Sequence, residues 1–448
     1  MDVYREISLH LHGSSSGASM SSVVRKRQIF SITWITYAGF YLCRKNLSIV
    51  MPLLHGSAGL DSLALANIVF GYSLLYVIGQ FVCGPLSDRF GAKRVVGAGL
   101  VLIIISNLMM SLHASLPWLL VFACINGVGQ STGWSGLVKI MALWFDRQDR
   151  GVIMAWWGTN YVFGGFIATA FAAWSVAQPW ILVNLAWRRG FILPAVILLF
   201  ITVVFLLGVQ ERPGTNRSAS AVTAKVSFGR KDRSDWSDLA ALLRNPALWM
   251  VSVSYFFLEL CRYALMFWLP LYLVERLKYN LQVSGYVSSL YDLVGIVGAV
   301  LAGYISDRLL QSRRAPVSAV MLFGLGIVML FQPTLTQFGL AGVAVAISLA
   351  GIFSYGPDTL LSGAFVQDIG EAKAAATACG LVEGIGHMGS LFSPYVVVYV
   401  SGRYGWDRVF LIFAAAAFIS GMVLLPMWKL RPRQTSEVRI GSEAVQTT

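Results

Sequence analysis

Two adjacent cationic residues, Arg44 and Lys45, stand near the middle of an apolar segment, residues 32–54, that is long enough to cross a bilayer. An ionised side chain at that depth costs roughly 2.5–3.5 kcal/mol on insertion scales, so it needs a compensating partner. A guanidinium presents a planar fork of donors that matches the oxygen pairs of phosphate and carboxylate groups. The chemistry that these residues suggest is anion binding inside a membrane.

A second intramembrane arginine, Arg262, corresponds to Arg44 in a sequence repeat. The segment GPLSDRFGAKR, which begins at Gly84, is echoed by GYISDRLLQSRR from Gly303, and at the same spacing WRRGFILPA from Trp187 is echoed by WDRVFLIFA from Trp406. Arg44 and Arg262 are separated by one residue less. Matches at nearly one spacing indicate a duplicated unit.

The elements that must position these residues are membrane-spanning helices. The chain of 448 residues is 56% hydrophobic and only 12% charged, which excludes a soluble domain of this size. Apolar runs between polar or Gly/Pro-rich breaks predict six helices in the first half, near 28–53, 64–86, 95–112, 116–145, 151–178 and 190–209. Six more follow near 247–274, 283–305, 316–332, 338–366, 373–401 and 408–429.

The predicted fold is therefore an all-α membrane protein of twelve transmembrane helices in two pseudo-symmetric six-helix bundles. The predicted organisation is an N-terminal tail (1–27), a first bundle (28–209), a polar linker (210–246), a second bundle (247–429) and a C-terminal tail (430–448). Most of the Lys and Arg residues fall in the tails, the linker and the loops on the same side as these. Positive charge marks the cytoplasmic side, so we expect both termini and the linker to be cytoplasmic. The net charge of +13 then reflects topology and not a nucleic-acid partner.

One face of the first helix carries polar and aromatic residues, and the same spacing recurs in the seventh. Residues at i, i+4, i+7 and i+11 share a helix face; these are Tyr37, Tyr41, Arg44 and Ser48 in the first half, and Tyr255, Glu259 and Arg262 in the second. Two parallel halves form the arrangement of major facilitator transporters, whose substrate site lies between the halves near the midplane. Two arginines that face one cavity repel each other unless an anion lies between them.

Several motifs resemble those of the organophosphate:phosphate antiporter family of the major facilitator superfamily, over essentially all twelve helices. They are YAGFYLCRKN in the first helix, GQSTGWSGLVKIMALWF (129–145), SYGPDTLLSG (354–363) and KAAATACGLVEGIGHMGS (373–390). In the second half, FWLPLYL and SSLYDLVGIVGAVLAGYISDR are most similar to the sugar-phosphate exchangers. The resemblance implies electroneutral exchange of a phosphorylated metabolite for inorganic phosphate by alternating access.

The resemblance also implies roles for particular residues. Arg44 and Arg262 would bind the phosphoryl group. The cavity lining would comprise Tyr37, Tyr41, Tyr76, Trp134 and Tyr355, and we add Tyr161, Glu259 and His387. The loop motifs would hold the cytoplasmic gate through Asp88, Arg89, Asp307 and Arg308. Where glycerol-phosphate members have a lysine, a histidine and a tyrosine, this chain has Gln80, Tyr161 and Glu259.

Two alternative functions stay open at this point. One is a transporter-like sensor that binds a hexose phosphate and signals to a membrane sensor kinase. The other is a proton-coupled symporter of an organic anion, suggested by Glu259, Glu383 and His387. Lys45 can either form a structural ion pair or take part in transport. Asp292 and Asp358 are intramembrane acids to which the sequence assigns no partner.

The sequence contains no P-loop, HExxH or paired Cys/His motif. We therefore expect no enzyme activity, no cofactor and no metal. The expected partners are a small phosphorylated anion, inorganic phosphate and the lipid bilayer. We expect a monomer in a bacterial inner membrane.

Overall fold

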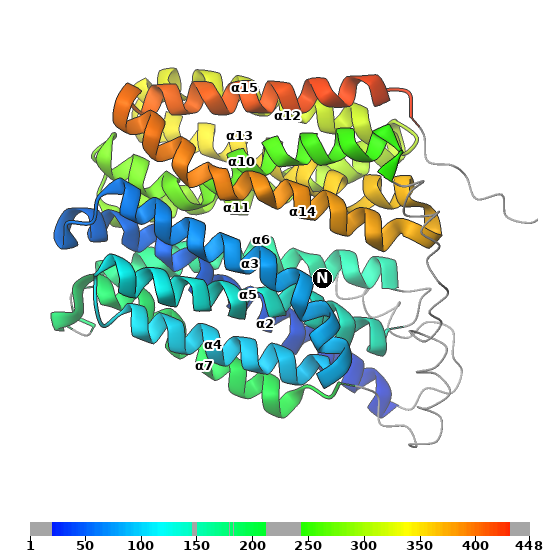
Figure 1. Ribbon diagram of the computed structural model, residues 1–448, viewed down its shortest axis with the longest axis horizontal. Coiled ribbons are helices and arrows are strands. Elements are labelled where there is room, and N and C mark those ends of the chain that lie inside the picture. Colours follow the sequence, from blue (N-terminus) through cyan, green and yellow to red (C-terminus); the bar gives the residue numbers. More distant parts are fainter. Residues whose placement is uncertain (1–19, 146–149, 179, 182, 212–242, 431–448) are drawn as a thin grey trace, which may run out of the picture.

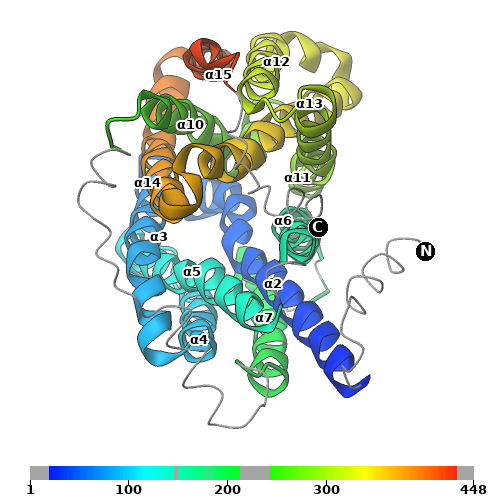
Figure 2. The same ribbon diagram turned by 90° about the vertical axis from the view of Figure 1, so that its right-hand side faces the viewer.

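The computed structural model describes residues 20–145, 150–178, 180–181, 183–211 and 243–430. This part of the chain contains twelve α-helices that run side by side along the long axis of the molecule (Figure 1). Seen from one end of that axis, α2–α7 form one half and α10–α15 the other (Figure 2). The predicted helical membrane fold in two six-helix halves is confirmed.

The helices begin and end close to the predicted boundaries. The first half comprises α2 (Met20–Ala58), α3 (Ser62–Phe90), α4 (Ala92–Met110), α5 (Leu116–Trp144), α6 (Arg150–Ala177) and α7 (Arg189–Gly208), with the 3-10 turn η1 (Val183–Arg188). The second comprises α10 (Pro246–Glu275), α11 (Leu281–Tyr304), α12 (Arg314–Leu335), α13 (Gly339–Thr359), α14 (Phe365–Tyr404) and α15 (Trp406–Leu424). Short segments η2 (Ile305–Leu309), η3 (Thr336–Phe338), η4 (Leu360–Ala364) and η5 (Leu425–Met427) complete it.

Two predicted helix ends differ from the structure. The first helix begins at Met20, so residues 20–27, placed in the predicted tail, are helical. The predicted break at residues 367–372 is also helical, because the chain passes from α13 through the π-helical η4 directly into α14. That segment contains a single glycine and no proline, and it leads into the strong helix formers of EAKAAA. Residues 212–242 of the predicted linker, and 431–448 of the C-terminal tail, lie outside the described residues.

Equivalent capping residues begin the second helix of each half. The Asp61 carboxylate accepts a hydrogen bond from the Ala64 backbone N–H at 2.7 Å. The Asn280 side chain accepts one from the Val283 N–H at 2.8 Å. Both caps satisfy backbone donors that the first helical turn leaves unpaired. The repeat seen in the sequence is therefore also a repeat of local structure.

Close helix packing recurs in the two halves at equivalent glycines. A Cβ atom at Gly127 of α5 would collide with the backbone oxygen of Tyr72 in α3. A Cβ atom at Gly351 of α13 would likewise collide with the backbone oxygen of Tyr291 in α11. Small residues let membrane helices approach closely. In both halves, such a contact joins the second helix to the fourth, α3 to α5 and α11 to α13.

By length and composition, eight stretches of the described chain could cross a membrane, and one of them, Arg314–Ala364, contains both α12 and α13. The helices missing from this set are α2, α5 and α14. Of these, α2 and α14 carry charged residues in their middle, and α5 is rich in Gly, Ser, Thr, Asn and Gln. The outer surface is apolar, with Phe200 71% and Leu207 81% exposed on α7. Such an apolar surface is typical of helices that face lipid.

Candidate functional site

Arg44 is buried among tyrosines and has no carboxylate partner among the described residues. Its Nε donates a hydrogen bond to the Tyr72 hydroxyl at 2.7 Å. Its Cζ lies 4.3 Å from the ring centre of Tyr76 and 5.2 Å from that of Tyr41. The residue is only 6% exposed. Aromatic faces stabilise a guanidinium without neutralising its charge, so Arg44 keeps a net positive charge inside the protein.

Arg262, the counterpart of Arg44 in the repeat, is paired with two carboxylates. One is Glu259 on the preceding turn of α10, as their spacing predicts. The other is Asp358 of α13, whose Oδ1 lies 2.6 Å from the Arg262 Nη1. The Arg262 Cζ also lies 5.0 Å from the ring centre of Tyr355. The two arginines are therefore equivalent in sequence and different in electrostatics.

The carboxylates around Arg262 extend into a cluster of polar contacts. The Tyr255 hydroxyl donates to Asp358 at 3.0 Å. The second oxygen of Glu259 lies 3.4 Å from Nδ1 of His387 on α14. The His387 ring centre lies 5.9 Å from that of Tyr76, which belongs to the other half. The cluster therefore reaches from the second half to the aromatic residues that surround Arg44.

Lys45 joins the halves through Asp292 of α11, a partner that the sequence analysis left open. The Lys45 Nζ lies 2.5 Å from Asp292 Oδ2, and the side chains are 4% and 1% exposed. The Tyr355 hydroxyl donates to the other oxygen of Asp292 at 2.6 Å. A buried ion pair needs such extra hydrogen bonds to offset the desolvation of both charges. Lys45 and Asp292 are thus neutralised by each other.

The remaining predicted cavity residues form an aromatic wall on both halves. The Tyr37 ring centre lies 5.3 Å from that of Trp134 and 5.9 Å from that of Tyr41. Across the interface, the ring centres of Tyr161 and Tyr355 are 6.0 Å apart. Trp134 is 38% exposed although it lies on α5 in this inner group. The structure brings the predicted cavity residues together around the two arginines.

The two halves are joined by polar contacts at one end. We call this end, which carries His55, the His55 end, and the opposite end the Met20 end. His55 Nε2 lies 3.4 Å from Glu275 Oε1, and the Tyr395 hydroxyl donates to Asn67 at 3.0 Å. Toward the Met20 end, inward-facing side chains such as Trp134 remain exposed. In the described residues, these contacts between the halves therefore lie at the His55 end.

The predicted gating residues form contacts within their own halves. Asp88 Oδ1 lies 2.8 Å from Lys139 Nζ in an ion pair between the end of α3 and α5. Asp307 pairs with Arg314 at the equivalent place in the second half. The Arg89 guanidinium lies 5.3 Å from the ring centre of Phe90, and Arg308 is exposed. In the described part of the chain, none of these four residues bridges the halves through a polar contact.

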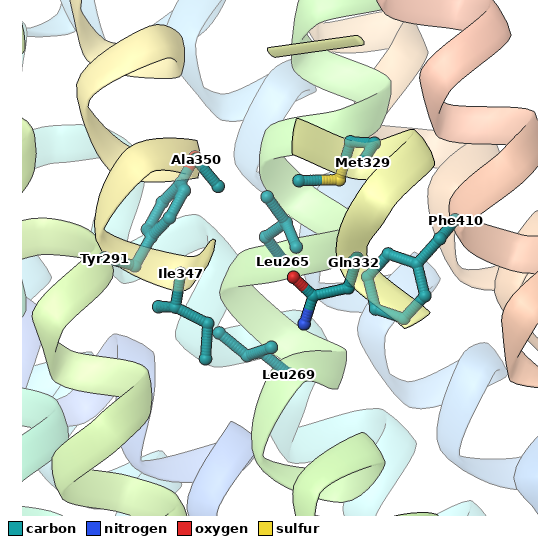
Figure 3. Close-up of a pocket in the computed structure, with 8 residues that line it drawn as sticks. All are labelled: Leu265, Leu269, Tyr291, Met329, Gln332, Ile347, Ala350 and Phe410. Atoms are coloured by element: carbon teal, nitrogen blue, oxygen red, sulfur yellow. The ribbon is translucent and has the colours of Figure 1, made fainter. Parts of the chain in front are cut away.

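A separate narrow space lies inside the second half, between α10, α11, α12, α13 and α15 (Figure 3). It is lined by Leu265, Leu269, Tyr291, Met329, Gln332, Ile347, Ala350 and Phe410. The space has no room for a water molecule, and its lining is almost entirely apolar. It includes neither arginine, so it is not where an anion would bind.

The chain matches the family model of the Major Facilitator Superfamily over residues 33–375. It is 28% identical to a glycerol-3-phosphate transporter of Bacillus subtilis over 434 residues, which cover 91% of this chain and 93% of that one. It is 25% identical to a probable hexose phosphate transport protein of Chlamydia trachomatis, with 90% and 91% of the chains covered. It is 26% identical to the membrane sensor protein UhpC of Salmonella typhimurium, with 92% and 94% covered.

A solved structure with the same fold is that of a bacterial homolog of the human lysosomal transporter Spinster, in an inward-facing and unoccupied conformation. Its TM-score is 0.71 over 92% of this chain and 96% of that chain. The sequence identity is 12%, so this likeness supports the fold alone.

Proposed function

We propose that this chain, which belongs to the Major Facilitator Superfamily, carries a small organophosphate across a membrane in exchange for inorganic phosphate. Members of this superfamily are transporters and not enzymes. The relatives named for glycerol-3-phosphate and for hexose phosphate support a sugar-phosphate or glycerol-phosphate-like substrate. The observation that carries the proposal is Arg44, a buried guanidinium between aromatic rings that no described carboxylate neutralises.

In the proposed mechanism, the phosphoryl group binds to Arg44 first. Its oxygens match the guanidinium fork, and its negative charge offsets the cost of burying that cation. Arg262 can contribute a second fork when Glu259 or Asp358 gives way. Binding would then rearrange the pairs that hold α10 to α13 and α14. Coupling of this kind is what alternating access requires, because the ligand must interact differently with the two states.

The orientation follows from the distribution of positive charge. In a bacterial inner membrane the Met20 end would then face the cytoplasm, and the His55 end, where the halves are in contact, would face outward. In this proposal the structure represents the inward-facing state of the transport cycle. Exchange would proceed when the Lys45–Asp292 and His55–Glu275 contacts open and the halves close at the Met20 end.

The proposal is tested by counterflow in proteoliposomes. Purified protein is reconstituted with internal unlabelled phosphate, and uptake of radiolabelled phosphate is followed with and without a panel of external organophosphates. Uptake that requires internal phosphate and is inhibited by sugar phosphates or glycerol phosphate is expected. A proton-coupled symporter would instead take up its anion without internal phosphate. Absence of both activities would contradict the transport proposal.

A second candidate function is ligand sensing, which the similarity to a membrane sensor protein favours. A sensor would bind an organophosphate at Arg44 and transmit the change to a membrane kinase. Ligand-dependent thermal stabilisation of purified protein, combined with no counterflow, would favour sensing.

A further inference from the structure

We infer that the substrate carries an ammonium group as well as a phosphate or phosphonate group; this inference rests on the proposed function. It follows from the surroundings of Glu383 on α14, a carboxylate to which the transport proposal assigns no role. The substrate class is a small phosphorylated amine or an aminoalkylphosphonate, which is zwitterionic at neutral pH.

Glu383 faces the interface between the halves and has no polar partner among the described residues. No described cation pairs with it, and its side chain is neither fully buried nor exposed. His387 and Arg262 of its own half lie within electrostatic range, but Arg262 already pairs with Glu259 and Asp358. Tyr37 of the other half lies within that range too. An inward-facing carboxylate that no cation contacts directly is costly, and a cationic ligand group would offset that cost.

The depth of Glu383 relative to Arg44 can be followed along α14. His387 packs against Tyr76, and the Tyr76 ring lies 4.3 Å from the Arg44 Cζ, so His387 and Arg44 stand at a similar depth. Glu383 precedes His387 by four residues, which is roughly 6 Å along the helix. Because α14 runs from the Met20 end, Glu383 lies about one turn from Arg44 on the Met20 side.

On the first half, Tyr37 precedes Arg44 by seven residues in α2, so like Glu383 it lies on the Met20 side of Arg44. Tyr37 and Trp134 pack with their ring centres 5.3 Å apart. Trp134 is 38% exposed, whereas its neighbour Trp157 in the same group is 0% exposed and serves packing. Aromatic faces attract ammonium groups, and a nearby carboxylate adds to that attraction. Tyr37, Trp134 and Glu383 therefore make a place for an ammonium group, next to a place for a phosphate at Arg44.

The charges of the site also favour a zwitterion. The central cations are Arg44, Lys45 and Arg262, and the central acids are Glu259, Asp292, Asp358 and Glu383. Glu259, Asp292 and Asp358 each pair with one of these cations, so Glu383 is the acid that stays available to a ligand. An ammonium group on the ligand would supply its counter-ion. Glu383 and Arg44 differ in depth by roughly 6 Å. A chain of two or three carbons between the ammonium and phosphate groups of the ligand suits that distance.

The test compares two ligands that differ in one group. Proteoliposomes loaded with radiolabelled phosphate are challenged from outside with 2-aminoethyl phosphate, 2-hydroxyethyl phosphate or inorganic phosphate. The half-maximal concentration for release of label is measured for each compound. We expect a value at least about tenfold lower for the amine than for the alcohol, a difference of about 1.4 kcal/mol.

Substitution then assigns the preference to a residue. In Glu383→Gln the ratio between amine and alcohol should fall close to one. In Glu211→Gln the ratio should stay as in the unsubstituted protein; Glu211 accepts from the Ala92 N–H at 2.9 Å, far from the cavity, and a glutamine can still accept. If Glu383→Gln does not fold, thermal stabilisation of the unsubstituted protein by the two ligands measures the same preference.

The outcomes separate this inference from the proposed function. Equal potency of amine and alcohol, with both driving exchange, would overturn the inference and leave organophosphate exchange intact. A preference that survives in Glu383→Gln would overturn the role of Glu383. Release of label by none of the three compounds would contradict the proposed function itself.

Discussion

Lys45 of α2 and Asp292 of α11 form an ion pair across the two halves, with 2.5 Å between Nζ and Oδ2. Tyr355 fixes the second oxygen of Asp292, and the pair is almost completely buried. It lies one residue from Arg44, so the anion site and the contact between the halves share one stretch of α2. Any movement of the halves that separates this pair must also change the surroundings of Arg44.

Removing one member of this pair should be more damaging than removing both charges. Lys45→Met and Asp292→Asn should each lower the thermal unfolding midpoint, because each leaves an unpaired buried charge at a cost of roughly 3–5 kcal/mol. The double variant should recover much of the loss. Unfolding of the three purified variants in one detergent measures this. Losses that simply add in the double variant would show that the two residues are not coupled.

The two arginines should differ in their contribution to stability. Arg262→Gln leaves Glu259 and Asp358 without their cation and should lower the unfolding midpoint clearly. Arg44→Gln breaks no ion pair with a described carboxylate and should lower it much less, or raise it. The comparison needs only the two variants and the unsubstituted protein in the same detergent. A larger loss for Arg44→Gln would mean that Arg44 has a structural counter-ion.

Glu259 should compete with the ligand for Arg262. Glu259→Gln weakens the hold on Arg262, so phosphate should bind more tightly and exchange should be slower, because the empty carrier loses an internal counter-ion. Equilibrium binding and counterflow rates, measured side by side, test this. Weaker phosphate binding in Glu259→Gln would instead assign Glu259 to helix packing with His387.

Asp88 should affect turnover more than affinity. Its contact with Lys139 lies at the Met20 end, away from the arginines, so Asp88→Asn should change the balance between conformations and leave the phosphate contacts intact. Lys139→Gln removes the same ion pair and should have the same effect. Exchange rate and phosphate affinity are measured for both. Variants that differ strongly from each other would show that Asp88 acts through another contact.

The sequence predicted most helix ends because polar, glycine or proline residues stand beside them. It failed between α13 and α14, where polar residues lie within a continuous helix. Hydropathy predicts which segments can span a membrane, whereas continuity of the backbone helix depends on helix propensity. The two criteria disagree at this polar segment.

The partners inside the site could not be assigned from the sequence. The spacing of Glu259 and Arg262 predicted their contact, because both lie on one helix. The contacts of Asp292 and Asp358 depend on how α11 and α13 are placed against α2 and α10, which a helix period does not define. One feature of the sequence could have predicted the Lys45–Asp292 pair. An intramembrane acid needs a cation, and Lys45 was an intramembrane cation without an assigned partner.

The measurement that tests the phosphate site most directly is phosphate exchange by Arg44→Lys. Lysine keeps the charge and loses the planar fork, so we expect exchange to fall at least about tenfold while the protein stays folded and inserted. Arg403→Lys, at the exposed end of α14, is the matched control and should exchange normally. Exchange by Arg44→Lys at the rate of the unsubstituted protein would contradict a phosphate site at Arg44.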